Sequence, residues 1–172
     1  MIGKEVILEE TEQQIVKEVA EKRTANNRNS GVKNSKRCSE SDVEIELNSF
    51  GAEVAFCKLF NVYPDYSVFT RSSTKGEDKG DAVIGELVVD VKQTKYRSGK
   101  LIVVPWKANK SKGKISCYAL MVGEFPKYIF KGFIETNEIL KTERLGNLGY
   151  GETYIATQNE LKEFKELKNE LG

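Results

Sequence analysis

The segment GDAVIGELVVDVKQT, residues 80–94, constrains the fold of this chain more than any other. Its β-branched and apolar residues indicate two short strands, 81–84 and 86–94. Gly85 between them suits a tight turn, because glycine adopts positive φ at little steric cost. The segment therefore predicts a β-hairpin.

Three charged side chains converge at one end of this hairpin. Residues i and i+2 leave the same face of a strand, so Asp90 and Lys92 project together. Val89 and Val91 alternate with them and point into the opposite layer. Folding at the turn returns Asp81 to the neighbourhood of Asp90. Two carboxylates and a lysine at one strand end predict a divalent-metal site with a cationic partner.

Composition narrows the chemistry that such a site could use. The chain contains no histidine, which excludes serine–histidine and cysteine–histidine nucleophile pairs, histidine-ligated zinc and a histidine general base. Hard oxygen ligands remain, and these favour Mg²⁺ or Mn²⁺. Cys38, Cys57 and Cys117 are odd in number and lack metal-type spacing, so we expect a reduced, intracellular protein of the cytoplasm.

Length and hydropathy indicate one globular domain. The chain has 172 residues, of which 31% are charged and 39% hydrophobic, enough for one ordinary core. No apolar run approaches the length that a bilayer-spanning helix needs, and the N-terminal residues do not resemble a secretory signal. We therefore expect no membrane partner.

Basic residues are concentrated in two runs that contain no acid, 22–39 and 91–123. The net charge is only +1, so the acids gather elsewhere and the molecule is polarised. Such a distribution suits contact with an anionic polymer on one side. A pair of solvated loops would show the same pattern, and the sequence leaves that alternative open.

The order of the predicted elements indicates an α/β protein with a central mixed β-sheet flanked by helices. We expect a helix at 4–23 followed by a basic, flexible arm, so that residues 1–40 extend a domain at 41–172. Ser41 and Glu44 form a capping-box pattern that predicts a second helix at 42–60. Further strands are expected at 66–70, 101–104, 115–122, 128–134 and 153–156, a helical turn at 137–140 and a C-terminal helix from Asn159.

The second predicted helix carries two acids that could approach the hairpin. Glu46 and Glu53 are seven residues apart and lie on about the same helix face. Glu53 follows Gly51, where the lack of a side chain lets the helix approach the sheet most closely. We therefore expect Glu53, and not Glu46, to reach Asp81 and Asp90. A solvated acid on an exposed face is the alternative.

The order helix-Glu, Asp, Asp-x-Lys resembles that of the PD-(D/E)XK nuclease superfamily. The matching pieces are NSFGAEVAFCKLF around Glu53, KGDAVI around Asp81 and VVDVKQT around Asp90, Lys92 and Gln93. The resemblance covers roughly residues 42–122. It implies a restriction-endonuclease-like fold for residues 41–172. Small members of that superfamily include Holliday-junction resolvases and phage endonucleases.

The resemblance implies a role for each matching residue. Asp81 would be the central metal ligand, Asp90 the second and the backbone carbonyl of Val91 the third. Glu53 would bind the metal directly or through water. Lys92 would contact the attacking water and the developing phosphorane charge, as a base or as an electrostatic stabiliser. Gln93 would be accessory, holding a ligand water or capping the strand.

These roles imply a metal-dependent endonuclease that hydrolyses phosphodiester bonds of duplex or branched DNA with Mg²⁺ or Mn²⁺. A homodimer is expected, since one small domain must cut two strands. Two alternatives remain, a catalytically inactive nucleic-acid-binding protein of the same fold and a sheet protein whose Asp-Val-Lys is a strand terminus with a surface ion pair. The expected nucleic-acid contacts lie before Asp81 and in the second basic run: Arg71, Ser72, Ser73, Lys95, Arg97, Lys107, Lys110, Lys112 and Lys114.

Overall fold

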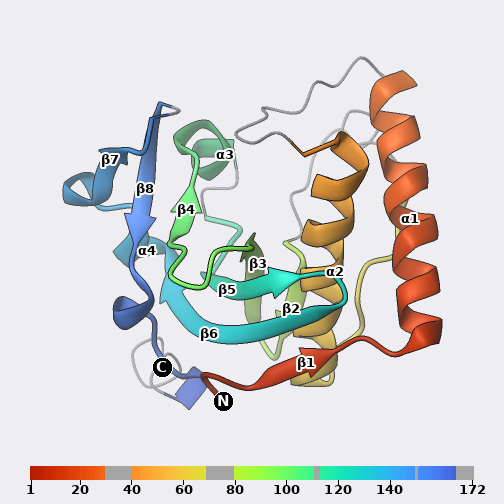
Figure 1. Cartoon of the computed structure of the whole chain (residues 1–172). Coiled ribbons are helices and arrows are strands. Elements are labelled where there is room, and N and C mark those ends of the chain that lie inside the picture. Colours follow the sequence, from red (N-terminus) through yellow and green to blue (C-terminus); the bar gives the residue numbers. More distant parts are fainter. Residues whose placement is uncertain (30–39, 69–79, 111–112, 150, 166–172) are drawn as a thin grey trace.

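A five-stranded, curled mixed sheet forms the centre of the molecule (Figure 1). The computed structural model describes residues 1–29, 40–68, 80–110, 113–149 and 151–165. Strands β3 and β5 are parallel, and the other neighbours are antiparallel. The strand order is β1 (Glu5–Ile7), β6 (Lys127–Glu135), β5 (Cys117–Glu124), β3 (Leu87–Thr94) and β2 (Ala82–Ile84). The predicted hairpin is β2–β3, with Gly85 at φ 62° in its turn.

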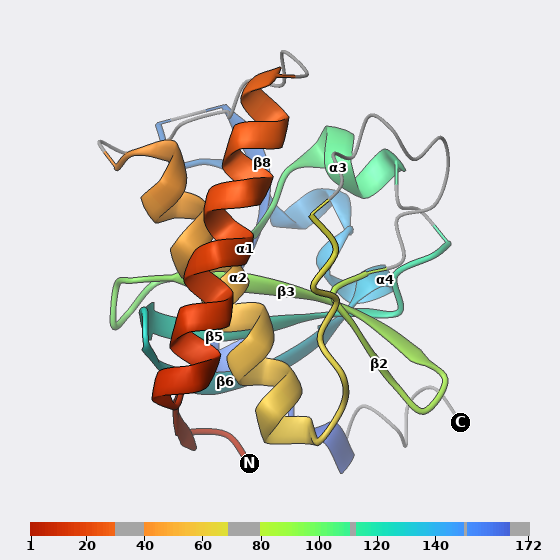
Figure 2. The same ribbon diagram turned by 90° about the vertical axis from the view of Figure 1, so that its right-hand side faces the viewer.

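Helix α2 (Asp42–Phe60) packs on one face of this sheet, and the long helix α1 (Glu10–Asn29) packs against α2 (Figure 2). The predicted start of α2 is confirmed. Its N-cap Ser41 accepts a hydrogen bond from the Glu44 amide at 3.3 Å, and the Ser41 amide donates to the Glu44 carboxylate at 2.8 Å. In the part of the chain that the structure describes, no helix combines the length and the apolar character that crossing a membrane requires.

A second, three-stranded antiparallel sheet covers the other face. Its strands are β4 (Leu101–Val103), β8 (Glu152–Ala156) and β7 (Leu145–Asn147). Short helices accompany it: α3 (Pro105–Lys110), α4 (Thr136–Ile139) and two 3₁₀ turns, η1 (Thr142–Arg144) and η2 (Gln158–Glu160). The sequence predicted strands near β4 and β8 but not this separate sheet, because β4 and β8 are far apart along the chain and β7 was not predicted.

The alternation of side chains along β5 shows how the sheet divides two cores. Ala119 and Met121 are buried against α1 and α2, whereas Tyr118 and Leu120 are buried against the small sheet. The predicted class, a mixed α/β protein with helices on a central sheet, is therefore confirmed. Cys57 and Cys117 are buried free thiols, and Cys38 lies outside the described residues.

The N-terminal segment, which was predicted to extend a domain at 41–172, packs against that domain. Strand β1 pairs with β6 at the edge of the large sheet, and Val6 and Leu8 are buried in the core beneath α2. The helix expected at 4–23 begins only at Glu10, because the residues before it extend the sheet. Residues 30–39 of the predicted arm lie outside the described part.

The C-terminal segment also differs from its prediction. A helix from Asn159 was expected, but the chain first forms η2 and pairs with β6 at Lys162. Residues 164–165 are helical, and the rest of the predicted helix, 166–172, lies outside the described residues. The amides of Phe133 and Lys162 each donate to the other residue's carbonyl, at 2.9 and 2.8 Å. Tertiary pairing thus overrides the helical spacing there. Residues 66–68 of the predicted strand 66–70 are not in a strand, and the rest of it lies outside the description.

Candidate functional site

The β2–β3 hairpin places Asp81 directly beside Asp90. The Asp81 amide donates to the Val89 carbonyl at 2.8 Å, and its Oδ2 accepts from the Val91 amide at 2.7 Å. Gly80 makes this entry possible at φ 69°, where a Cβ would lie 2.6 Å from Val88 Cγ1. The structure therefore confirms that the turn brings Asp81 next to Asp90.

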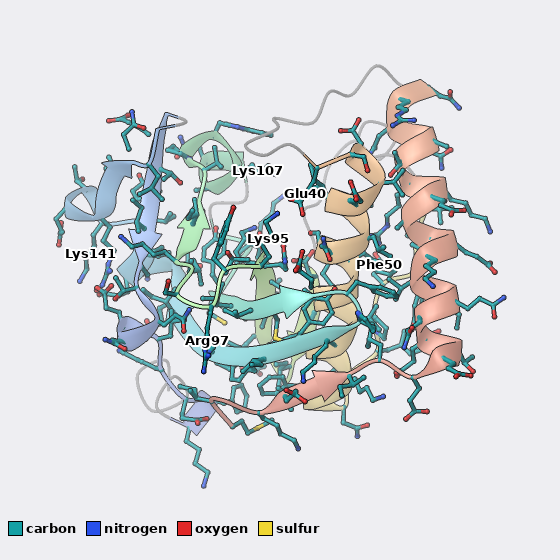
Figure 3. The ribbon with its side chains drawn as sticks, in the orientation of Figure 1. Glu40, Phe50, Lys95, Arg97, Lys107 and Lys141 are labelled. Carbon is teal, nitrogen blue, oxygen red and sulfur yellow. The ribbon has the colours of Figure 1, made fainter. Side chains whose placement is uncertain are left out.

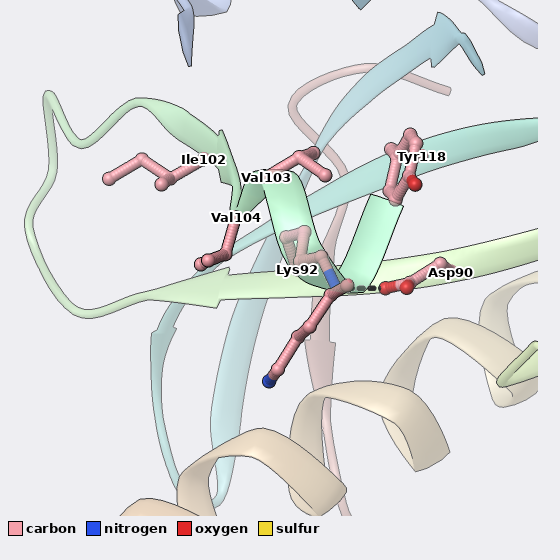
Figure 4. Close-up of a pocket in the computed structure, with 7 residues that line it drawn as sticks. Asp90, Lys92, Ile102, Val103, Val104 and Tyr118 are labelled. Atoms are coloured by element: carbon pink, nitrogen blue, oxygen red, sulfur yellow. Dashed lines mark hydrogen bonds and ion pairs between the residues drawn. The ribbon is translucent and has the colours of Figure 1, made fainter. Parts of the chain in front are cut away.

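Asp90 and Lys92 project together, as predicted from strand periodicity. The Lys92 ammonium donates to Asp90 Oδ1 and lies 5.6 Å from the centre of the Tyr118 ring (Figure 4). The side chains of Lys92 and Asp90 are 26% and 19% exposed, so the pair is shielded but still reaches solvent. Tyr118 stands opposite Asp90 in the parallel pairing of β3 and β5.

Lys92 is held in its charged form. Burial lowers the pKa of its ammonium, but the negative charges of Asp90 and Asp81 raise it by more, so the pKa lies above its ordinary value. The lysine therefore carries a proton at neutral pH.

A pocket of about 100 Å³ opens beside the Asp90–Lys92 pair (Figure 4). It lies between β3 and the small sheet, on the face opposite α1 and α2. Its walls are partly apolar, with the charged groups at one side. The lining residues are Asp90, Lys92, Ile102, Val103, Val104, Lys107 and Tyr118.

Glu53, which was predicted to reach Asp81 and Asp90, lies on α2 beside Arg23 of α1. It belongs to α2, and its Oε2 lies 3.6 Å from Arg23 Nη1 of α1, while Glu46 Oε1 lies 3.4 Å from the same nitrogen. Burial, and then the charges of Glu53 and Asp81, raise the pKa of the Cys57 thiol to about 12. Both carboxylates thus act on one thiol of α2, and Asp81 also acts on Lys92.

The donor set fits a magnesium ion that keeps much of its water. Among the described residues no three Asp, Glu or Cys side chains form a cluster able to hold an ion. Mg²⁺ is commonly bound through one or two carboxylates, with water and substrate phosphate completing the shell. Asp81 and Asp90 offer these two. The Val91 carbonyl leaves β3 on the same edge as its amide, the edge at which Asp81 lies.

Gln93 does not join the other motif residues. It follows Lys92 on β3 and therefore points to the opposite face, where its Nε2 donates to the Gly123 carbonyl at 2.6 Å. This bond ties the ends of β3 and β5 together.

The predicted basic contacts are spread along the molecule (Figure 3). Lys95 forms an ion pair with Glu40 at 3.2 Å, and Arg97 is exposed at the other end of β4 from Lys107. Lys107 and Lys114 are exposed, and only Lys107 lines the pocket. Lys110 belongs to α3, but its side chain is not described. Arg71, Ser72, Ser73 and Lys112 lie outside the described residues.

Two residues near the site were missed in the sequence. Tyr118 is brought to Asp90 by the parallel pairing of β3 with β5, which no local pattern encodes. Arg23 donates to the carbonyls of Asp65 and Ser67, both at 2.8 Å, and its guanidinium lies 4.1 Å from the Phe50 ring centre. Arg23 belongs to the first basic run, 22–39, so the sequence showed its charge but not the residues that it contacts.

The model of a family of unknown function, DUF5843, matches residues 1–129 of the chain. The matched stretch holds Glu53, Asp81, Asp90, Lys92 and Tyr118, so it includes the whole candidate site. No curated protein and no solved structure gives a match to the chain.

Proposed function

The chain belongs to the DUF5843 family, whose function is unknown, and we propose that it is a metal-dependent nuclease that hydrolyses phosphodiester bonds of DNA. The observation that carries this proposal is the meeting of three charges at one strand edge. Asp81 and Asp90 lie side by side, and a protonated Lys92 is held against them. Hydrolysis of a phosphodiester needs a way to bind the anion and to neutralise the charge that develops on it.

The residues of the site divide this work. Asp81 and Asp90 would hold Mg²⁺ or Mn²⁺ together with the Val91 carbonyl, and the bound metal would supply a water of lowered pKa and polarise the phosphate. Lys92 places a positive charge beside the carboxylates, where it orients the phosphate and offsets negative charge in the transition state. Tyr118 fixes the direction of the Lys92 side chain through its ring face.

Glu53 fits this scheme as a ligand through water and not as a direct ligand. The structure gives it Arg23 as a neighbour, and α2 packs on the sheet face opposite the Asp90–Lys92 pair. Asp81, directly before the edge strand β2, acts on groups of both faces, Cys57 and Lys92. A water shell that reaches around this edge would bring Glu53 into contact with the metal.

The restriction-endonuclease-like fold is part of the same proposal. It is supported by an antiparallel hairpin that carries both aspartates and the lysine, a parallel neighbour of that hairpin, and a helix before it that carries the glutamate. The small sheet β4–β8–β7 would then be an addition to the shared core.

An inactive nucleic-acid-binding protein of the same fold is the second candidate. One observation favours it: Asp81 Oδ2 and Asp90 Oδ1 are engaged within the hairpin, and no third acid joins them among the residues described. Such a protein would bind nucleic acid through its basic residues and leave it intact.

Nicking of supercoiled plasmid DNA separates the candidates. We expect nicking with Mg²⁺ or Mn²⁺ and binding without turnover with Ca²⁺. Asp81→Asn, Asp90→Asn and Lys92→Ala should each reduce the rate by a factor of about 10² or more, because each removes a group that acts on the transition state. Glu86→Gln is the matched control, since Glu86 is an exposed acid of the same hairpin. Binding without nicking under all metals would support the second candidate. If the protein neither binds nor nicks DNA, the remaining alternative is a sheet protein whose Asp-Val-Lys is a strand terminus with a surface ion pair.

A further inference from the structure

The single tryptophan of the chain lies on the surface next to the site. Trp106 is 58% exposed and belongs to the six-residue helix α3. The helix is fixed by Ala108, which is buried beside Leu101 and Val103 of the second core. The amides of Lys107 and Ala108 both donate to the Val104 carbonyl at 3.0 Å. The indole is therefore presented to solvent from a firmly held turn.

The residues around Trp106 in this turn also line the pocket. Val104 and Lys107, which lie two residues before and one residue after Trp106, line the pocket that contains Asp90 and Lys92. The Lys107 ammonium lies 5.6 Å from the centre of the indole ring. A large flat apolar surface and a cation thus stand together at the margin of the candidate active site.

The surroundings of Trp106 indicate what would cover it. It lies in the middle of residues 91–123, which contain eight Lys and Arg and no acid. A polyanion that also carries flat apolar groups matches both features, and nucleic acid is that polymer. The faces of bases stack on aromatic side chains in single-stranded complexes, whereas in a duplex those faces are stacked on each other.

We propose that Trp106 is a stacking platform for an unpaired base, so that the site takes single-stranded nucleic acid in preference to a duplex. This inference rests on the nuclease function proposed above. With a base stacked on Trp106, the neighbouring backbone phosphate would pass Lys107 and enter the pocket at Asp90 and Lys92. The substrate class is therefore a single strand, or the unpaired segment of a branched molecule.

The fluorescence of the parent protein tests the contact directly, because Trp106 is its only tryptophan. The probe is single-stranded oligodeoxythymidylate in Ca²⁺, with a duplex of equal length for comparison. We expect the single strand to quench the emission in a saturable manner and the duplex to leave it nearly unchanged. Equal responses to both probes, or binding of the single strand without any change in emission, would overturn the proposal.

Variants test the preference itself by fluorescence anisotropy of labelled probes. Trp106→Leu should weaken single-strand binding about 10-fold, equivalent to about 1.4 kcal/mol, with little change for the duplex. Trp106→Phe keeps a flat ring and should recover most of the affinity. Tyr63→Leu, which removes an aromatic side chain that is 85% exposed elsewhere, is the matched control. Circular dichroism checks that each variant is folded.

The outcomes separate this inference from the function beneath it. If Trp106→Leu binds and cleaves a single strand like the parent while Asp90→Asn does not cleave, the stacking platform is wrong and the nuclease stands. If Trp106→Leu loses single-strand binding but no metal supports cleavage, the stacking inference is correct and the protein is a nucleic-acid-binding protein without nuclease activity. If the protein binds neither probe, both proposals fail, and Trp106 is a contact for a different class of partner.

Discussion

At the scale of single residues, Lys92 is the group whose state most determines what the site can do. Its burial alone would favour loss of the proton, and the neighbouring Asp90 and Asp81 reverse that tendency. The lysine is therefore a fixed cation at neutral pH. In the function proposed above, such a cation would attract and neutralise a phosphate and would not take a proton from water.

We predict that Asp90→Asn lowers the pKa of Lys92. Asp90 is the nearest negative charge and also accepts a hydrogen bond from the ammonium, while the burial that opposes the charge remains in the variant. A carbon-detected NMR titration of the lysine Cε resonances measures this directly, with Lys92→Met to assign the signal. An unchanged or raised pKa in Asp90→Asn would contradict the pairing described here.

The same shift predicts a pH dependence of stability. A raised pKa in the folded state means that the charged lysine stabilises the fold below its ordinary pKa of 10.5 and that this contribution is lost as the pH rises through the folded value. The free energy of unfolding of the parent should therefore fall relative to Lys92→Met above about pH 10.5. Urea unfolding of both proteins at pH 8 and pH 11 measures the change. A constant difference between them would contradict the prediction.

The aspartates and the lysine could be predicted from sequence because their meeting is local. Strand periodicity and one glycine turn suffice to bring Asp81, Asp90 and Lys92 together. Tyr118 and Arg23 could not be found in this way, since their contacts depend on which distant strand or helix packs beside them. The neighbour of Glu53 could not be found for the same reason, because Arg23 comes from α1.

At the scale of elements, the close packing of α2 on the sheet depends on Gly51. A Cβ at this position would overlap the Tyr128 hydroxyl of β6, which donates to the Asn48 carbonyl at 3.0 Å. The sequence predicted a close approach at this glycine, and the structure confirms it. The partner was not predictable, because it comes from a strand that lies far along the chain.

We predict that Gly51→Ala destabilises the protein, although alanine is the better helix former by about 1 kcal/mol. Overpacking in a filled core costs about 1–3 kcal/mol, and here the obstacle is a fixed, hydrogen-bonded hydroxyl. Chemical denaturation measures the loss. Gly51→Ala in a Tyr128→Phe background should cost less than in the parent, because the overlapping oxygen is gone. A more stable Gly51→Ala protein would show that helix propensity outweighs the overlap.

Elements with strong local signals were predicted well, and those that depend on distant partners were not. The capping box at Ser41 and the turn at Gly85 gave α2 and the β2–β3 hairpin nearly to the residue. The C-terminal segment has helical spacing at Leu161 and Phe164, yet Leu161 packs into the second core and Lys162 pairs with Phe133 of β6. Contacts with distant parts of the chain therefore determine the conformation at Leu161 and Lys162.

At the scale of the whole molecule, the large sheet separates two kinds of surface. One face is sealed by α1 and α2, and the other carries the pocket between β3 and the small sheet. Asp90 and Lys92 face the second side, where Lys107 of α3 also lines the pocket. For the function proposed above, we therefore expect the substrate to approach from the side of β4 and α3.

The N-terminal segment closes the sealed face. Strand β1 adds the last strand to the sheet beside β6, and Leu8 follows it into the core with no exposed surface. Ile7, its neighbour, is 54% exposed on the outer side. The two residues are adjacent, similar in size and opposite in burial, so together they test whether this segment belongs to the domain.

We predict that Leu8→Ala destabilises the protein by about 2–5 kcal/mol, because it removes buried methyl groups and leaves a cavity between β1 and the helices. Ile7→Ala should cost much less, since its side chain is largely in water already. Urea unfolding of the two variants gives the comparison, and plasmid nicking at a temperature where both are folded should be equal. A core of residues 41–172 that folds without this segment would instead tolerate Leu8→Ala as easily as Ile7→Ala, which would support the predicted boundary at residue 40.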